Sequence, residues 1–321
     1  MIDPTTPGHP LASHTELRAQ AAELRLHGLL AHWDELMGNP ETEQRVRQWL
    51  GWETAERAQR SLERRLREAH LGRFKAPLAA EEPDVIVFNG DYIYEGGISN
   101  NRPRRHNSPE ITTLDAYRKR YGLYKSDRRL QAAHEAAPWI VTWDDHEVEN
   151  NYAGTTPQDP ADQAGFLARR VAAYQAYWEH QPLRTEPLEG NLSLHRSISW
   201  GSLVDFLVLD GRQYRSDQVC SNDVAEDCGT RTSPSNTMLG TDQKNWLLAE
   251  MTAPQGRWTV LANQVAMTPM PFGTAFNMDQ WDGYPAERTE LLDAMANLRN
   301  AVVLTGDFHA AGVGDGAQVT C

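Results

Sequence analysis

Cysteine is scarce in this chain of 321 residues, since only Cys220, Cys228 and Cys321 are present. Structural zinc sites need cysteine pairs at close spacing, whereas Cys220 and Cys228 stand eight residues apart and no second pair exists. The scarcity therefore excludes a zinc-ribbon framework. Cys220 and Cys228 could close a small disulfide loop, which would suggest an oxidising compartment. The first residues show neither the basic region nor the apolar core of a signal peptide, so the compartment stays open.

Long hydrophobic runs and an excess of basic charge are also missing. No stretch approaches the roughly 18 apolar residues that a bilayer-spanning helix needs, so we expect no membrane span. The net charge is −13, which argues against a dominant nucleic-acid surface. An acidic protein of this kind can hold metal cations, but it repels anionic substrates unless metals or arginines offset the charge locally. The sequence leaves the oligomeric state open.

Three common catalytic motifs are absent as well. The chain has no GxSxG nucleophile elbow, no HExxH zinc helix and no GxxxxGK[ST] phosphate loop. A serine hydrolase of the elbow type, a zincin protease and a P-loop ATPase are therefore unsupported.

The pattern of apolar residues divides the chain in two. Residues 1–75 predict helices, one from 13 until Gly38-Asn39-Pro40 and another over 41–70. From residue 81 onward strands, helices and long polar segments alternate. The expected buried strands are 84–89, 138–143, 203–209, 258–263 and 301–305. The expected helices are 167–180, 242–251 and 286–298, and the expected loops are 97–112, 153–162, 214–240 and 269–284.

Acidic side chains follow three of these strands. Asp91 comes after the run 85–89 and Gly90, and Tyr94 follows three residues later. Asp307 comes after 301–305 and Gly306, with His309 two residues further on. Carboxylate and imidazole are common metal ligands, and a phenolate suits oxidised iron. The alternatives are a carboxylate that caps the next turn, a packed tyrosine and an ordinary turn histidine.

The third strand end crowds four ionisable residues, 144–147, behind the apolar run 139–143. Such crowding is costly unless a cation neutralises it, and we prefer Asp145 as the ligand. His146 would then donate a proton or contact phosphate. Arg212, which follows the strand 203–209, could clamp a phosphate through two parallel hydrogen bonds or could pair with a carboxylate. Three strand ends that deliver Asp and His to one rim predict a hydrolytic metal site.

Several segments together resemble one known family. The stretches DVIVFNGDYIYEG, TWDDHEVENNYA, LDGRQYRSDQ, NQV, DQWDGYPAER and LTGDFH occur in that order at 84–96, 142–153, 209–218, 263–265, 279–288 and 304–309. They resemble the PhoD-like, or alkaline phosphatase D, branch of the metallophosphatases over about residues 79–312.

The resemblance implies an α+β fold, a four-layer α/β/β/α sandwich of metallophosphatase type. It implies hydrolysis of phosphate monoesters or diesters, with a small phosphate ester as substrate and with iron(III) and calcium as metals. By position, the metal ligands would be Asp91, Tyr94, Asp145, Asp307 and His309, whereas His146 and Arg212 would face the phosphate.

The chain departs from the family pattern at both ends. The family begins its catalytic domain with a strand that ends in a cysteine ligand of iron, and that strand and cysteine are absent here. Few residues follow His309, so we expect a metallophosphatase domain over 79–321 that is incomplete at both ends. Residues 13–73 resemble the helical N-terminal module of IstB-like transposition helper ATPases. The alternative function is therefore a catalytically incomplete fusion that acts as a helical adaptor or a nucleic-acid-associated module.

Overall fold

The chain forms two compact units, residues 1–75 and 76–321. The structure is a computed structural model that describes residues 13–23, 26–40, 42–47, 49–50, 78–98, 104–221, 223–309, 313–314 and 319–320. Residues 51–70 of the second predicted helix lie outside the described residues, and so do residues 51–73 of the segment that resembles IstB-like proteins. Within the described residues, no helix is both long enough and apolar enough to cross a membrane.

The first unit is helical where it is described. Its helices are α1 (His14–Glu23), α2 (His27–Ala31) and α3 (Trp33–Met37), and residues 42–47 are helical too. The first predicted run is thus three short helices rather than one. It stops where the sequence indicated, because Gly38 is the C-cap of α3. A small apolar core holds the unit together and contains Leu17, Ala21, Trp33, Met37, Val46 and Leu50.

A four-stranded sheet organises one half of the second unit. Its order is β3 (Arg196–Trp200), β4 (Val204–Val208), β6 (Trp258–Ala262) and β8 (Ala301–Leu304). β3 runs antiparallel to β4, whereas β4, β6 and β8 are parallel. The strands expected at 203–209, 258–263 and 301–305 are confirmed. Parallel strands bring their carboxyl ends to one edge, which is where open α/β sheets bind ligands.

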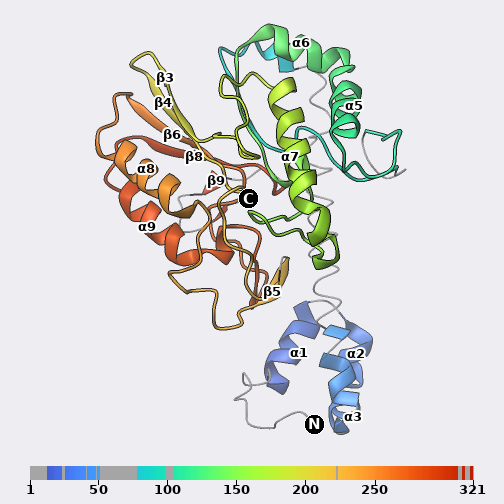
Figure 1. The fold of residues 1–321 in the computed structure, drawn as a ribbon. Helices are drawn as coiled ribbons and strands as arrows, with labels where there is room; N and C mark the ends of the chain where they lie inside the picture. The colour runs from blue at the N-terminus through green and yellow to red at the C-terminus, as the bar shows by residue number, and fades with distance from the viewer. Residues whose placement is uncertain are drawn as a thin grey trace. The chain divides into compact units, whose positions relative to one another are not determined.

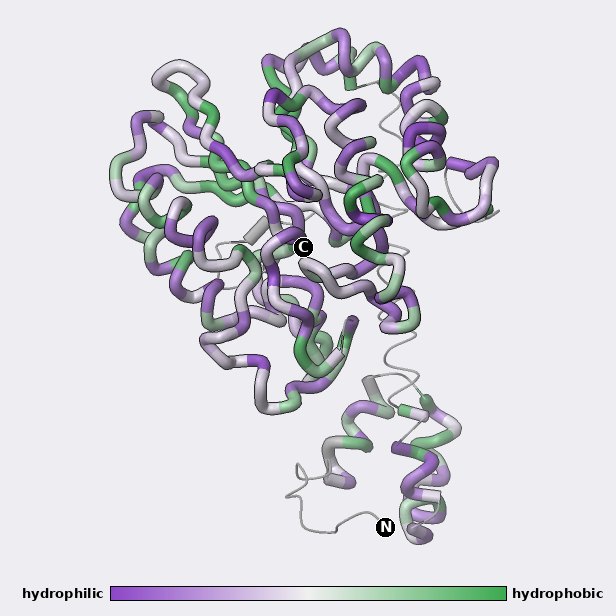
Figure 2. The backbone as a smooth tube through the Cα atoms, viewed as in Figure 1, coloured by the Kyte–Doolittle hydropathy of each residue, from purple (hydrophilic) through white to green (hydrophobic). Residues whose placement is uncertain are grey.

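Side chains of β4 alternate between the two faces of this sheet. Leu207 joins a core with α8 (Gly240–Thr252) and α9 (Pro285–Met295), which lie side by side in Figure 1. Phe206 and Val208 point to the other face, where they pack with Ile140 of β2. Figure 2 shows hydrophobic residues along these strands. The alternation follows from the two-residue period of a strand that is covered on both faces.

The other half of the second unit is a two-stranded parallel sheet with its own helices. β1 (Ile86–Asn89) pairs with β2 (Trp139–Thr142), and α5 (Leu114–Lys125), α6 (Arg128–Ala136) and α7 (Gln163–His180) belong to this half. An aromatic core joins Trp143 of the segment after β2 to Tyr174 and Tyr177 of α7. The helices α5 and α6 were not predicted. Their N-caps Thr113 and Asp127 each accept a hydrogen bond from a backbone N–H of the following helix.

The polar segments contain little regular structure. β5 (Val224–Glu226) pairs with β7 (Ala275–Asn277) inside two segments that were expected to be loops. Cys220 and Cys228 form a disulfide beside β5. The short elements that remain are β9 (Val313–Gly314), β10 (Val319–Thr320) and the 3-10 helices Leu78–Glu81, Asp145–Glu147, Pro160–Asp162 and Trp281–Gly283.

Candidate metal centre

Three strand ends meet at the place where the sequence predicted a site. β1 and β2 end in register, with Asn89 opposite Thr142. The turn after β8 approaches them, because a Cβ added to Gly306 would lie 3.1 Å from the carbonyl oxygens of both Asn89 and Gln264. A side chain at this position would push against both carbonyl oxygens, so glycine suits the close backbone approach. The residues that follow β1, β2 and β8 therefore lie close together, although they are far apart in the sequence of the second unit.

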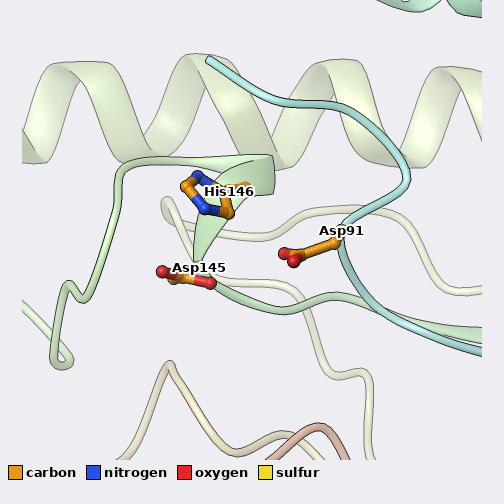
Figure 3. A group of neighbouring side chains, drawn as sticks. All are labelled: Asp91, Asp145 and His146. Atoms are coloured by element: carbon orange, nitrogen blue, oxygen red, sulfur yellow. The ribbon is translucent and has the colours of Figure 1, made fainter. Parts of the chain in front are cut away.

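The carboxylates that follow the strands form two overlapping groups. Ligand atoms of Asp91, Asp145 and His146 lie within 4.8 Å of one another, and so do those of Asp144, Asp145 and Asp307. Figure 3 shows the Asp91 carboxylate pointing from its own chain segment toward Asp145 and His146. Asp145 belongs to both groups, which makes it the centre of the acidic cluster.

Several oxygens of this cluster have no partner in the protein. Among the described residues, Asp91 Oδ1, Asp144 Oδ2 and Asp145 Oδ1 are buried and accept no hydrogen bond. Burial and the neighbouring charge of Asp145 raise the pKa of Asp307 to about 6. Burial likewise raises the pKa of Asp145. Unpaired carboxylate oxygens that face one another are costly, and they are the donors that hard cations prefer. The residues present therefore fit a metal ion.

Tyr94 and His309 lie against the same cluster. The Tyr94 hydroxyl donates a 2.9 Å hydrogen bond to Asp91 Oδ2. His309 Nε2 lies 3.2 Å from the Tyr94 hydroxyl oxygen and 3.9 Å from Asp91 Oδ2. Burial, followed by the charge of Asp91, raises the pKa of Tyr94 far above its ordinary value, so the side chain is a neutral phenol here. All five residues predicted to bind metal are thus neighbours, although they come from three chain segments.

His146 is held by a carboxylate that the sequence did not single out. Its Nδ1 lies 2.7 Å from Glu95 Oε2, and the other oxygen of Glu95 accepts a hydrogen bond from the Asn150 backbone N–H at 3.0 Å. Burial alone would lower the pKa of His146, but the carboxylates of Asp145 and Glu95 outweigh it and raise the pKa to about 10. The two carboxylates therefore favour the protonated form of His146, which is the form that a proton donor needs.

Arg212 lies inside the protein, behind the cluster. Its side chain is 0% exposed. Its Nε donates to Asp144 Oδ1 at 2.5 Å, and its two terminal nitrogens donate to the two oxygens of Asp279 at 2.7 Å each. Of the two roles that the sequence left open for Arg212, the contacts show the pairing with carboxylates. Arg215 also donates to Asp279, at 2.7 Å.

Two further side chains hold the ligand-bearing turns. Glu147 accepts hydrogen bonds from the backbone N–H groups of Asp91 and Asp144 at 3.0 and 2.7 Å, and Gln280 Nε2 donates to Asp307 Oδ2. Burial, followed by the charge of Asp91, raises the pKa of Glu147 to about 8. The sequence offered one signal for them, because both lie inside the motifs that carry the family resemblance.

Comparison with known proteins agrees with this geometry. A family model described as PhoD-like phosphatase matches residues 68–318. Alkaline phosphatase D of Bacillus subtilis (strain 168) is 44% identical over 247 residues, which are 73% of this chain and 42% of that protein. A solved structure described as "Structure of PhoD" aligns with a TM-score of 0.70 and 43% identity, over 74% of this chain and 48% of that chain.

The chain thus spans less than half the length of these relatives. The family match nevertheless covers residues 76–318 of the second unit, which ends at residue 321. It contains every residue of the acidic cluster. The chain belongs to the PhoD-like phosphatase family.

Proposed function

We propose that this chain hydrolyses phosphate esters with the help of bound metal ions. One observation carries the proposal: three separate strand ends deliver Asp91, Asp145 and Asp307 to one cluster, in which Asp91 Oδ1 and Asp145 Oδ1 are buried and accept no hydrogen bond from the described residues. A protein gains nothing in stability from such an arrangement, because like charges raise each other's free energy. Family membership supports the same function, and alkaline phosphatase D is the name of the relative that is 44% identical.

The proposed ligands are the five that the sequence indicated: Asp91, Tyr94, Asp145, Asp307 and His309. Asp91 lies close to Tyr94, His309 and Asp145, so it would hold a cation together with these side chains. A set of carboxylates, one phenol and one imidazole suits the hard cations iron(III) and calcium. The cysteine ligand that the family resemblance implies has no counterpart in this set, because no cysteine precedes Cys220 in this chain, and Cys220 and Cys228 are joined to each other.

The remaining residues act on the substrate or on the ligands. When bound, the cations would lower the pKa of a water so that it attacks phosphorus as hydroxide, and they would polarise the phosphoryl oxygens. His146, protonated and fixed through Nδ1 by Glu95, donates a proton to the departing ester oxygen. Arg212 supports Asp144 and Asp145 from inside the protein rather than binding the phosphate.

We place this activity in a metallophosphatase domain over residues 79–321. Its two sheets face each other through Phe206, Val208 and Ile140. The helices α8 and α9 cover the outer face of one sheet, and α7 contributes to the core on the other side of β2. This packing supports the four-layer α/β/β/α sandwich. Residues 1–75 supply none of the side chains named here.

The substitution Asp91→Asn tests the proposal. We expect release of p-nitrophenol from p-nitrophenyl phosphate and from bis(p-nitrophenyl) phosphate to fall by about 100-fold or more, because loss of a direct ligand should exceed the effect of an outer contact. Asp115→Asn is the matched control, since Asp115 is 73% exposed and pairs only with Lys119 in the structure as described. Elemental analysis of the purified protein accompanies the assay. Equal turnover in Asp91→Asn and the unaltered chain would remove Asp91 from the site, and an unaltered chain that binds no metal would refute the proposed function.

A further inference from the structure

A single buried carboxylate ties together the two turns that carry the proposed ligands. Glu147 is 1% exposed, and both its oxygens accept backbone hydrogen bonds. Oε2 accepts from the N–H groups of Asp91 and Asp144, at 3.0 and 2.7 Å, and Oε1 accepts from the N–H of Tyr92. The first and third of these bonds reach across 56 and 55 residues of sequence. Glu147 thus joins the turn after β1 to the turn after β2.

The turn after β1 needs such support. Asp91 has φ +58°, in the left-handed region that residues with a side chain seldom occupy, and the preceding Gly90 has φ +102°. A Cβ on Gly90 would overlap the Cβ and the backbone nitrogen of Asp144. The two turns therefore touch at Gly90, and Asp91 adopts its uncommon conformation at this contact. A conformation of this kind persists only when surrounding contacts hold it.

The contacts of Glu147 also show what it does not do. No ion pair in the described part of the chain joins Glu147 to a cationic side chain, although buried glutamates elsewhere have one, such as Glu149 with Arg169 at 2.9 Å. Its oxygens face backbone N–H groups, and Glu147 belongs to neither group of candidate ligands. It acts on the site through the backbone of Asp91 and Asp144.

We propose that Glu147 is a positioning residue that sets the spacing between Asp91 and the Asp144–Asp145 turn, and thereby the affinity of this pair for a cation. The inference rests on the proposed function only for the presence of that cation. Asp307 is held differently, by Gln280 and by the hydrogen bond from Gly306 N–H to the Gln264 carbonyl. Loss of Glu147 should therefore disturb the turns after β1 and β2 and leave the turn after β8 in place.

Hydrogen exchange of the full chain, stripped of metal by a chelator, tests the contact itself. In the unaltered protein we expect the amides of Asp91, Tyr92 and Asp144 to be protected, although all three lie beyond the strand ends. In Glu147→Gln, an NH₂ group replaces one acceptor, and these amides should exchange about tenfold faster or more. The Gly306 amide should keep its rate. Glu147→Asp keeps the carboxyl group but shortens the side chain, and it should behave like Glu147→Gln.

Titration with Mn²⁺, followed by the electron paramagnetic resonance of the free ion, tests the consequence. We expect Glu147→Gln to raise the Kd for Mn²⁺ by about 10- to 100-fold, the range for residues that orient metal ligands. The control is Glu149→Gln, a substitution of another buried glutamate two residues away that pairs with Arg169 outside the cluster. Glu149→Gln should change the Kd for Mn²⁺ by less than about threefold, even if it lowers the melting temperature as much as Glu147→Gln does.

The outcomes separate this inference from the proposed function. Unprotected amides at Asp91 and Tyr92 in the unaltered protein would overturn the inference whether or not the chain hydrolyses esters. An equal loss of Mn²⁺ affinity in Glu147→Gln and Glu149→Gln would overturn it too, because it would reflect general destabilisation. Protected amides and a selective loss of Mn²⁺ affinity would support the inference even in a chain that releases no p-nitrophenol, a result that would count against the proposed function alone.

Discussion

Two groups of buried acidic residues lie next to each other, and they differ in how their negative charge is balanced. In the arginine-paired group, Asp279 contacts Arg212 and Arg215. In the cation group, ligand atoms of Asp145 lie within 4.8 Å of those of Asp91 and of Asp307. Burial alone would raise the pKa of Asp279, but the two arginines outweigh it and lower the pKa to about 2, whereas burial and Asp145 raise the pKa of Asp307 to about 6. The two pKa values differ because the carboxylates have different charged partners, and not because one carboxylate is buried and the other is not.

The comparison shows which charges the protein balances by itself. A buried carboxylate is costly unless it is paired, and the arginine-paired group meets this condition from its own side chains. The cation group does so only in part, through the 3.5 Å contact between Arg212 and Asp145, the 3.9 Å contact between His309 and Asp91, and the neighbouring His146. The charge that is left is what an added cation would neutralise. The acidic region therefore has two parts: the arginine-paired group, which supports the fold, and the cation group, which is the candidate binding site.

The substitution Arg212→Met should have the largest effect on stability. It removes the partner of Asp144 and Asp279 while both carboxylates stay buried, and breaking a buried pair in this way costs about 3–5 kcal/mol. Urea unfolding in the presence of a chelator measures the change. The control is Arg118→Met, because the Arg118–Glu179 pair has an arginine that is 46% exposed, and such pairs contribute about 1 kcal/mol or less. Similar losses in both variants would show that burial does not distinguish the arginine-paired group.

At low pH the arginine-paired group should lose the contribution that it makes to the free energy of unfolding. The pKa of Asp279 falls from 3.8 to about 2 on folding. Its ionised form therefore stabilises the fold fully above about pH 5, and this contribution, at most about 2 kcal/mol, is lost as the pH falls toward 2. We expect the free energy of unfolding to drop more steeply between pH 5 and pH 2.5 in the unaltered protein than in Asp279→Asn. Parallel pH profiles for the two proteins would contradict the pairing.

The proximity of the acids in the cation group could be predicted from the sequence because its signals are local. Asp91, Asp145 and Asp307 each follow an apolar strand within a few residues, and parallel strands place their carboxyl ends together. The arginine-paired group could not be predicted in the same way. Arg212 and Asp279 are 67 residues apart, and an arginine after a strand gives no sign of whether its anion is a substrate or a side chain. The contacts that choose between the two come from the tertiary fold.

The same distinction applies to the fold. The five predicted strands are confirmed. They could be predicted because each is a short apolar run, which is typical of strands buried on both faces. The helices α5 and α6 were missed because they are largely polar and bury few residues, Tyr117, Arg120 and Tyr121 on α5 and Ala133 on α6. β5 and β7 were missed because each has three residues, too few for a periodic pattern. Glu95 had only the signal that it lies inside the motif 84–96, because its partner His146 is 51 residues away.

The substitution Asp307→Asn should have the smallest effect, and its sign should be opposite. The folded-state pKa of Asp307 is raised to about 6, so ionisation of Asp307 destabilises the metal-free fold above that pH. Removing the charge should therefore stabilise the metal-free protein by about 1 kcal/mol at pH 8, and the gain should vanish below about pH 3, where Asp307 is protonated in both the folded and the unfolded protein. Mn²⁺ should stabilise the unaltered protein more than the variant, because a ligand that binds only the folded state raises its stability. Melting temperatures in chelator and in Mn²⁺ measure both effects. A variant that is less stable than the unaltered chain in chelator would show that Asp307 is satisfied by the protein itself, as Asp279 is, and the contrast between the two groups would disappear.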